Sequence, residues 1–352
     1  MAEAHSEPDN GHEMPHDGVE EDTEVGAAIA MGVIFVGTIG LALLLAELLQ
    51  GQVPAAFEDP QDPTNPLLYL GLVIAFTAGI LLVAKLDLDW IIQAVVLGAV
   101  ALTMVYLYEP ILALIPGLGG APAFSLSLAL GAGLTALLYF YPEWYVVDAA
   151  AISVGAGATG LFGFSFGIVP ALVLLIAFAV YDAIAVYRTE HMLDLADSVV
   201  GLRLPVMLVV PKVAGYSFRE EIEQEDVPGE PAETAEEPPR PTEDEEATEA
   251  EGQDALFMGL GDIVIPGVLV VSSHVFLGDY AASLDAVVGL SPAVFVALTT
   301  LVGATAGFAV LMRSVLKGNP HAGLPALNGG ALLGFLIPVL WLFGTAPLIP
   351  QF

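Results

Sequence analysis

Two apolar stretches decide the class of fold: residues 167–187, GIVPALVLLIAFAVYDAIAVY, and residues 256–277, LFMGLGDIVIPGVLVVSSHVFL. Each is about as long as a helix that crosses the hydrocarbon core of a bilayer, which is roughly 30 Å thick. Each carries one acidic residue, Asp182 in the first and Asp262 in the second. A carboxyl group is costly to place inside a membrane, so each aspartate is a candidate functional residue.

Seven further apolar runs predict seven more membrane-spanning helices. They are residues 25–49, 67–84, 90–108, 123–141, 146–161, 292–312 and 323–348. Hydrophobic residues make up 56% of the 352 positions and charged residues only 14%, which is too few polar residues to cover a soluble protein. The sequence therefore predicts an all-α polytopic membrane protein with nine transmembrane helices.

The basic residues predict the orientation of these helices, because Lys and Arg beside a span favour the cytoplasmic side. All eight fall in loops that are cytoplasmic if the N-terminus is inside and the chain crosses nine times: Lys85, Arg188, Arg203, Lys212, Arg219, Arg240, Arg313 and Lys317. We therefore expect the N-terminus inside and the C-terminus outside. The expected regions are a cytoplasmic tail (1–24), helices one to six (25–189), a cytoplasmic loop (190–255) and helices seven to nine (256–352).

Acidic residues dominate the polar segments. Nine of the 41 lie in residues 1–24 and 16 in the low-complexity segment 219–254, and the net charge is −33. We expect both tracts to be solvated and disordered, and the charge disfavours a nucleic-acid partner. The acidic balance also suggests a host with a salty cytoplasm, a halophile. There is no cysteine, which excludes thiolate metal sites, and no sign of a cleaved signal peptide.

The two aspartates are predicted to form a pair. Asp182 lies six residues before Arg188 and Asp262 six residues after Leu256, so on helices both would lie roughly 9 Å below the same membrane face. Two carboxyl groups held close share one proton, so one can accept a proton from water while the other donates to a carbonyl oxygen. Gly259 and Gly261 would let a substrate backbone approach Asp262.

A third motif lies on the same inner side. Residues 323–330, GLPALNGG, open the ninth span. Pro325 lacks a backbone donor and disfavours a helical conformation at Leu324, which predicts an irregular backbone there. Irregular backbone at membrane depth is typical of a wet cavity or a site buried in protein.

These motifs, in this order within nine spans, resemble the presenilin and signal peptide peptidase family of GxGD-type intramembrane aspartyl proteases. The residues that match are Tyr181-Asp182, Gly259-Leu260-Gly261-Asp262 and Pro325-Ala326-Leu327. The resemblance covers residue 25 to the C-terminus and is to the single-chain archaeal members. It implies that Asp182 and Asp262 are catalytic and that Tyr181, Gly259, Leu260, Gly261, Pro325, Ala326 and Leu327 bind substrate or shape the site.

The resemblance also implies the substrates, which are transmembrane segments of membrane proteins or signal-peptide remnants cut within the lipid bilayer. No cofactor, metal or obligatory partner subunit is expected. An N-inside topology resembles that of presenilins and predicts single-pass substrates whose N-terminus is outside. The run 206–210, VMLVV, has strand propensity, and we expect it to pair with an extended substrate.

Three other interpretations stay open at this point. Residues 163–167, GFSFG, fit the Gly-x-Ser-x-Gly pattern of serine hydrolases, with Ser165 and His274 both expected near the outer face. The aspartate pair also fits a proton- or cation-coupled transporter or channel. The last is a packing scaffold without catalysis, for which small residues four apart, Gly303/Gly307 and Gly330/Gly334, would allow close helix packing.

The remaining polar residues are interpreted without a chemical role. Glu47 and Asp148 are expected to be polar anchors near the membrane edges. His5, His12 and His16 lie in the acidic tail, and no His-Glu-x-x-His pattern predicts a metal site from them.

Overall fold

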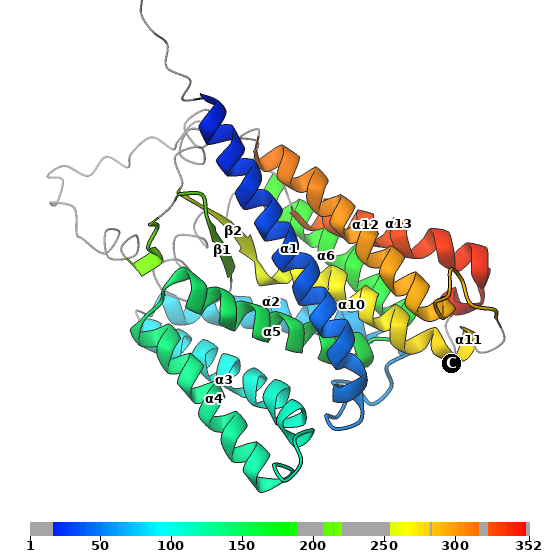
Figure 1. The fold of residues 1–352 in the computed structure, drawn as a ribbon, viewed down its shortest axis with the longest axis horizontal. Helices are drawn as coiled ribbons and strands as arrows, with labels where there is room; N and C mark the ends of the chain where they lie inside the picture. The colour runs from blue at the N-terminus through cyan, green and yellow to red at the C-terminus, as the bar shows by residue number, and fades with distance from the viewer. Residues whose placement is uncertain are drawn as a thin grey trace, which may run out of the picture.

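The computed structural model describes residues 17–86, 88–188, 207–213, 215–219, 254–281, 284–316 and 323–349 (Figure 1). Two predictions fall outside these residues, those for the tail histidines His5, His12 and His16 and for the acidic segment from residue 220 to 253.

Nine long helices and a two-stranded ribbon make up the described part of the chain. They are α1 (Asp17–Gln50), α2 (Asn65–Ala84), α3 (Asp89–Ala113), α4 (Ala121–Phe140), α5 (Trp144–Ser165), α6 (Ile168–Arg188), β1 (Met207–Pro211), β2 (Ala255–Gly259), α10 (Leu260–Phe276), α12 (Pro292–Val315) and α13 (Gly323–Leu342). A short helix α11 (Gly278–Ala281) and a 3-10 turn η1 (Ala346–Leu348) complete them.

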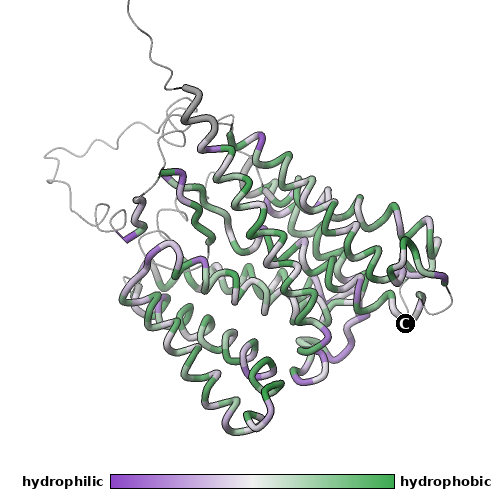
Figure 2. The backbone as a smooth tube through the Cα atoms, viewed as in Figure 1, coloured by the Kyte–Doolittle hydropathy of each residue, from purple (hydrophilic) through white to green (hydrophobic). Residues whose placement is uncertain are grey.

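Apolar helices of this length identify a multi-pass integral membrane protein. Seven of the described helices are long and apolar enough to cross a bilayer. The apolar parts of α6 (Ile168–Ile184) and α10 are shorter. Figure 2 shows hydrophobic residues along nearly the whole length of the helices, with hydrophilic residues concentrated at their ends and in the connections. The helix α2 lies on the outside of the helix bundle, and only 6% of the residues in its apolar stretch are buried inside the protein.

The predicted seventh span is wrong at its start. Residues Ala255–Gly259 form the strand β2, and the helix α10 begins only at Leu260. Gly259 has an extended conformation, with φ −64° and ψ 141°, which ends the strand and precedes the first helical turn. An apolar run has the same hydropathy in either conformation, so its periodicity could not separate the two.

The prediction of irregular backbone at Pro325 is also wrong. The helix α13 begins at Gly323 and continues through Pro325 to Leu342. Pro325 is the third residue of this helix, where a backbone N–H has no intrahelical acceptor, so the missing donor costs nothing.

Glycines on α5 allow close packing of α10, the helix that carries Asp262. A Cβ on Gly163 would collide with Val271 of α10, and a Cβ on Gly267 of α10 would lie 2.6 Å from Thr159 of α5. A Cβ on Gly155 would lie 3.3 Å from both Leu260 of α10 and Thr38 of α1. The helix α5 therefore fills the space between α1 and α10 through its small residues.

The four glycines predicted to allow close packing do so between α12 and α13. A Cβ on Gly303 would collide with the Gly330 carbonyl oxygen, and a Cβ on Gly307 would collide with that of Ala326. The backbones of the two helices are therefore in direct contact, and this contact fixes the position of the first turns of α13.

Candidate active site

Asp182 reaches the first turn of α13 from α6. It is half-buried, and its carboxylate oxygen Oδ2 accepts a hydrogen bond of 3.1 Å from the backbone N–H of Leu324. The first N–H groups of a helix have no acceptor within the helix, so a carboxylate fits there both as a hydrogen-bond partner and as a negative charge.

Asp262 approaches the same turn from α10. It lies in the first turn of that helix, two residues after the start at Leu260, and is partly buried. A Cβ placed on Gly323 would lie 3.4 Å from each oxygen of the Asp262 carboxylate, so this carboxylate lies against the α-carbon of Gly323. The absence of a side chain at Gly323 keeps this place open.

The two carboxylates therefore meet at consecutive residues, Gly323 and Leu324. These contacts place their nearest oxygens no more than about 10 Å apart. The predicted spacing along the seventh span was wrong, because residues 256–259 rise roughly 3.3 Å each as a strand rather than 1.5 Å as a helix. Both aspartates nevertheless reach the same turn of α13, at neighbouring residues.

The glycines beside Asp262 leave open space. A Cβ on Gly261 would meet no atom within 4 Å, and one on Gly259 would meet only the Asp262 carboxylate at 3.7 Å. Both glycines are exposed. The side chain of Leu260, between the two glycines, packs on Gly155 of α5 and anchors the start of α10. The Gly-Leu-Gly sequence therefore combines an open approach to Asp262 with one packing contact.

The other motif residues hold or border the aspartates. Leu327 is fully buried, and the carbonyl of Ala326 packs on Gly307, so these residues join α13 to its neighbours. Pro325 lies in the first turn of α13. Tyr181 is 40% exposed, and its ring lies 6.5 Å from that of Phe178 on the same helix.

Asn328 was missed by the sequence analysis. It is fully buried, and its side-chain Nδ2 donates a 2.9 Å hydrogen bond to the carbonyl oxygen of Leu175. The bond ties α13 to α6, which carries Asp182 seven residues further along. An amide directly after Pro325-Ala326-Leu327, inside an apolar run, was the signal that could have identified it.

The serine-hydrolase interpretation is not supported by the geometry. The Ser165 hydroxyl donates to the carbonyl of Leu161 (2.6 Å) and accepts from the N–H of Ala56 (2.8 Å), so it holds the first loop on the end of α5. His274 Nε2 lies 3.0 Å from Glu47 Oε1. The hydroxyl proton and the imidazole Nε2 thus have other partners.

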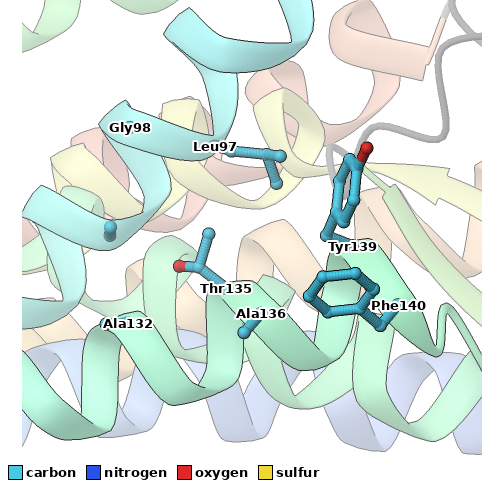
Figure 3. A pocket seen from close by; sticks show the side chains of 8 residues that line it. Leu97, Gly98, Ala132, Thr135, Ala136, Tyr139 and Phe140 are labelled. Atoms are coloured by element: carbon cyan, nitrogen blue, oxygen red, sulfur yellow. The ribbon is translucent and has the colours of Figure 1, made fainter.

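An apolar groove of about 370 Å³ lies between α3 and α4, away from both aspartates (Figure 3). The residues that line it are Leu97, Gly98, Ala101, Ala132, Thr135, Ala136, Tyr139 and Phe140. None carries a carboxylate or an imidazole, and the groove holds no pair of groups comparable to the two aspartates. Within the described residues no group of three His, Asp or Glu side chains could hold a metal ion.

Comparisons with known proteins agree on one family. The family described as signal-peptide peptidase, presenilin aspartyl protease matches residues 31–344. A crystal structure of a presenilin family intramembrane aspartate protease, in space group C222, is 31% identical, with a TM-score of 0.61 over 89% of this chain and 99% of that chain. A structure of a presenilin family intramembrane aspartate protease in space group P2 is 30% identical in sequence, with a TM-score of 0.56, and the match covers 93% of this chain and 98% of that chain. A comparison with curated proteins found no match. The chain belongs to the signal-peptide peptidase and presenilin family of aspartyl proteases.

Proposed function

We propose that Asp182 and Asp262 are the catalytic carboxylates of this intramembrane aspartyl protease. The observation that carries the assignment is the meeting of both carboxylates at Gly323-Leu324, from two helices that are distant in sequence. The family match gives the reaction, peptide hydrolysis within the membrane, and does not support the transporter or channel interpretation of the same pair.

The pair works through one water molecule. The ionised carboxylate takes a proton from the water as its oxygen attacks the scissile carbonyl carbon, while the protonated carboxyl donates its proton to the carbonyl oxygen. The resulting tetrahedral intermediate collapses when the first carboxyl passes the proton from water to the leaving nitrogen, the C–N bond breaks, and the second carboxylate takes a proton back from a hydroxyl of the intermediate. The first turn of α13 orients the pair through the Leu324 N–H, and no metal or covalent intermediate is needed.

An extended substrate would pair with β2 rather than with β1. The Lys212 N–H bonds the Asp254 carbonyl at 2.8 Å, just beyond the pair Pro211–Ala255. Bonded and non-bonded pairs alternate in an antiparallel ladder, so the N–H groups of Ala255, Phe257 and Gly259 point away from β1. Among the residues that the structure describes, none of these three groups has an acceptor. Ala255 is buried, so the edge that is open for strand addition runs over Phe257 and Gly259.

The edge of β1 that was expected to bind substrate is already closed. Its Val209 N–H donates to Asp148 Oδ1 at 2.8 Å, and Pro211 has no N–H to offer. A strand was predicted at residues 206–210 and is observed at Met207–Pro211, but its other edge is used by β2. The edge that remains open belongs to the strand that leads directly into Asp262.

We further propose nine membrane crossings, with the N-terminus inside and the C-terminus outside. The nine long helices support the count, with β2 and α10 together making the seventh crossing. The eight basic residues support the orientation. The substrates would then be single-pass proteins with an outside N-terminus, cut near the cytoplasmic side without an obligatory partner subunit.

A reconstituted cleavage assay tests the assignment. The protein in liposomes with a single-span substrate is compared with Asp182→Asn and Asp262→Asn, and we expect each variant to lose cleavage. Asp285→Asn, the same substitution in an exposed loop, is the matched control and should cleave like the parent. Normal turnover by either site variant would overturn the assignment, as would ion flux lost on Asp262→Asn in liposomes that show no cleavage.

A further inference from the structure

The buried carboxylate of Asp148 has no part in the mechanism above. It lies near the start of α5, is 6% exposed, and accepts the Val209 N–H at 2.8 Å inside the protein. Within the described residues no Lys, Arg or His forms an ion pair with it. Burying a carboxylate without a cation is costly, so the one bond that it makes should matter.

This bond holds the outer edge of the ribbon. The Val209 N–H points away from β2, so it can be bonded without disturbing the β1–β2 ladder. On the other side, β2 is followed directly by Leu260-Gly261-Asp262. A ribbon fixed to α5 at Val209 therefore fixes the direction in which β2 enters the active site. Lys212 bonds Glu24 of α1 at 3.0 Å and holds the far end of β1.

We propose that Asp148 is a positioning residue, which fixes the β1–β2 ribbon against α5 and closes the edge of β1, so that an extended substrate adds only to the edge of β2. This inference rests on the proposed function for the role of β2. It assigns to Asp148 control over where the substrate backbone lies relative to the aspartate pair. The choice of the bond that is cut would then depend on a residue remote from the chemistry.

A role limited to the packing of α5 makes a different prediction from the positioning role. If Asp148 only packs α5, its substitution should lower thermal stability. The cleavage position and the amide exchange of the β1–β2 ribbon should then stay unchanged in the folded protein. Positioning would alter both. The residue pair offers a test from each side, because Val209→Pro removes the donor without removing a ladder bond, whereas Leu208→Pro would break the ladder itself.

The experiment compares Asp148→Ala, Asp148→Asn, Val209→Pro and the double variant Asp148→Ala/Val209→Pro in the full-length reconstituted protein. The first readout is amide exchange by mass spectrometry over residues 207–211 without substrate. We expect Asp148→Ala to speed exchange there about tenfold or more, the factor that one lost hydrogen bond to a charged group gives. Asp148→Asn retains an acceptor oxygen and should stay within about threefold of the parent.

The second readout is the mass of the cleavage products together with kcat and KM. We expect Asp148→Ala and Val209→Pro to lower kcat about tenfold and to spread the cut over neighbouring bonds, with little further loss in the double variant. Asp148→Asn should restore one main cleavage site. Three results would each overturn the proposal. The first is that Asp148→Ala shows the same exchange and the same products as the parent. The others are additive losses of kcat in the double variant, or an Asp148→Asn variant that is as impaired as Asp148→Ala. Should Asp148→Ala fail to fold, Val209→Pro carries the same comparison.

The two readouts separate this inference from the proposed function. Exchange over 207–211 does not require activity, so it tests the bond even if the assignment of Asp182 and Asp262 fails. If the parent cleaves and both aspartate variants do not, while Asp148→Ala behaves like the parent, only the positioning role is lost.

Discussion

The contact between α12 and α13 gives a direct way to move the active site without touching an aspartate. Gly307 packs against the carbonyl carbon of Ala326 at 2.9 Å, measured from where a Cβ would lie, and the oxygen is closer still. Ordinary contact begins near 3.4 Å, so Gly307→Ala must push the first turn of α13 away by on the order of 1 Å. That turn carries Leu324, whose N–H holds Asp182.

The size of the effect can be worked out from these distances. Overpacking costs about 1–3 kcal/mol, partly offset by the roughly 1 kcal/mol that alanine gains over glycine in a helix. The net loss in unfolding free energy should therefore be about 0–2 kcal/mol, which leaves the protein folded. A displacement of 1 Å at the reacting groups can reduce turnover about 100-fold. We expect Gly307→Ala to lose far more kcat than stability.

Matched glycines make the assay decisive. Gly303→Ala creates the same kind of collision, with Gly330, one turn further from the aspartates, and should match the stability loss of Gly307→Ala with a smaller loss of kcat. Gly37→Ala in α1 places the new methyl group more than 4 Å from the other described residues, so it should leave kcat unchanged and gain about 1 kcal/mol of stability from the helix preference of alanine. Thermal unfolding and single-turnover cleavage in liposomes measure the two quantities. Equal losses of kcat in Gly307→Ala and Gly303→Ala would refute the reasoning.

Three further predictions concern other polar contacts. Asn328→Ala should lower kcat and destabilise the protein by about 1–3 kcal/mol, because it leaves the Leu175 carbonyl without its side-chain donor; thermal unfolding and cleavage rates check this. Ser165→Ala should cost about 1–2 kcal/mol of stability and retain cleavage, whereas loss of turnover in a folded variant would restore a catalytic role for this serine. Lys212→Met removes the bond to Glu24 and should speed amide exchange over residues 207–211 less than Asp148→Ala does; a larger effect would mean that α1 rather than α5 holds the ribbon.

Local sequence was sufficient for the parts of the fold that hydropathy alone determines. The apolar runs located the long helices, because a bilayer leaves few alternatives to a helix of about 20 residues. The strand at Met207–Pro211 followed from its β-branched residues and flanking prolines. The meeting of Asp182 and Asp262 followed from two carboxylates at the same end of consecutive spans.

Contacts between distant residues set the rest, and sequence patterns do not report them. Residues 256–259 became a strand because β1 offers a partner, although the same residues would also suit a helix. The bond between Asp148 and Val209 joins residues 61 positions apart, so neither residue alone indicated a partner. Pro325 shows the reverse error, because a proline in the first turn of a helix is compatible with regular structure.

The close packing between α5 and α10 has a consequence for the position of Asp262. With Gly163 against Val271 and Gly267 against Thr159, α10 has no free volume in which to slide or rotate past α5. Asp262 therefore lies on a helix that cannot shift past α5 unless this packing first opens. A larger side chain at Gly163 or Gly267 would act on Asp262 from the opposite side of α10 to the contact with α13.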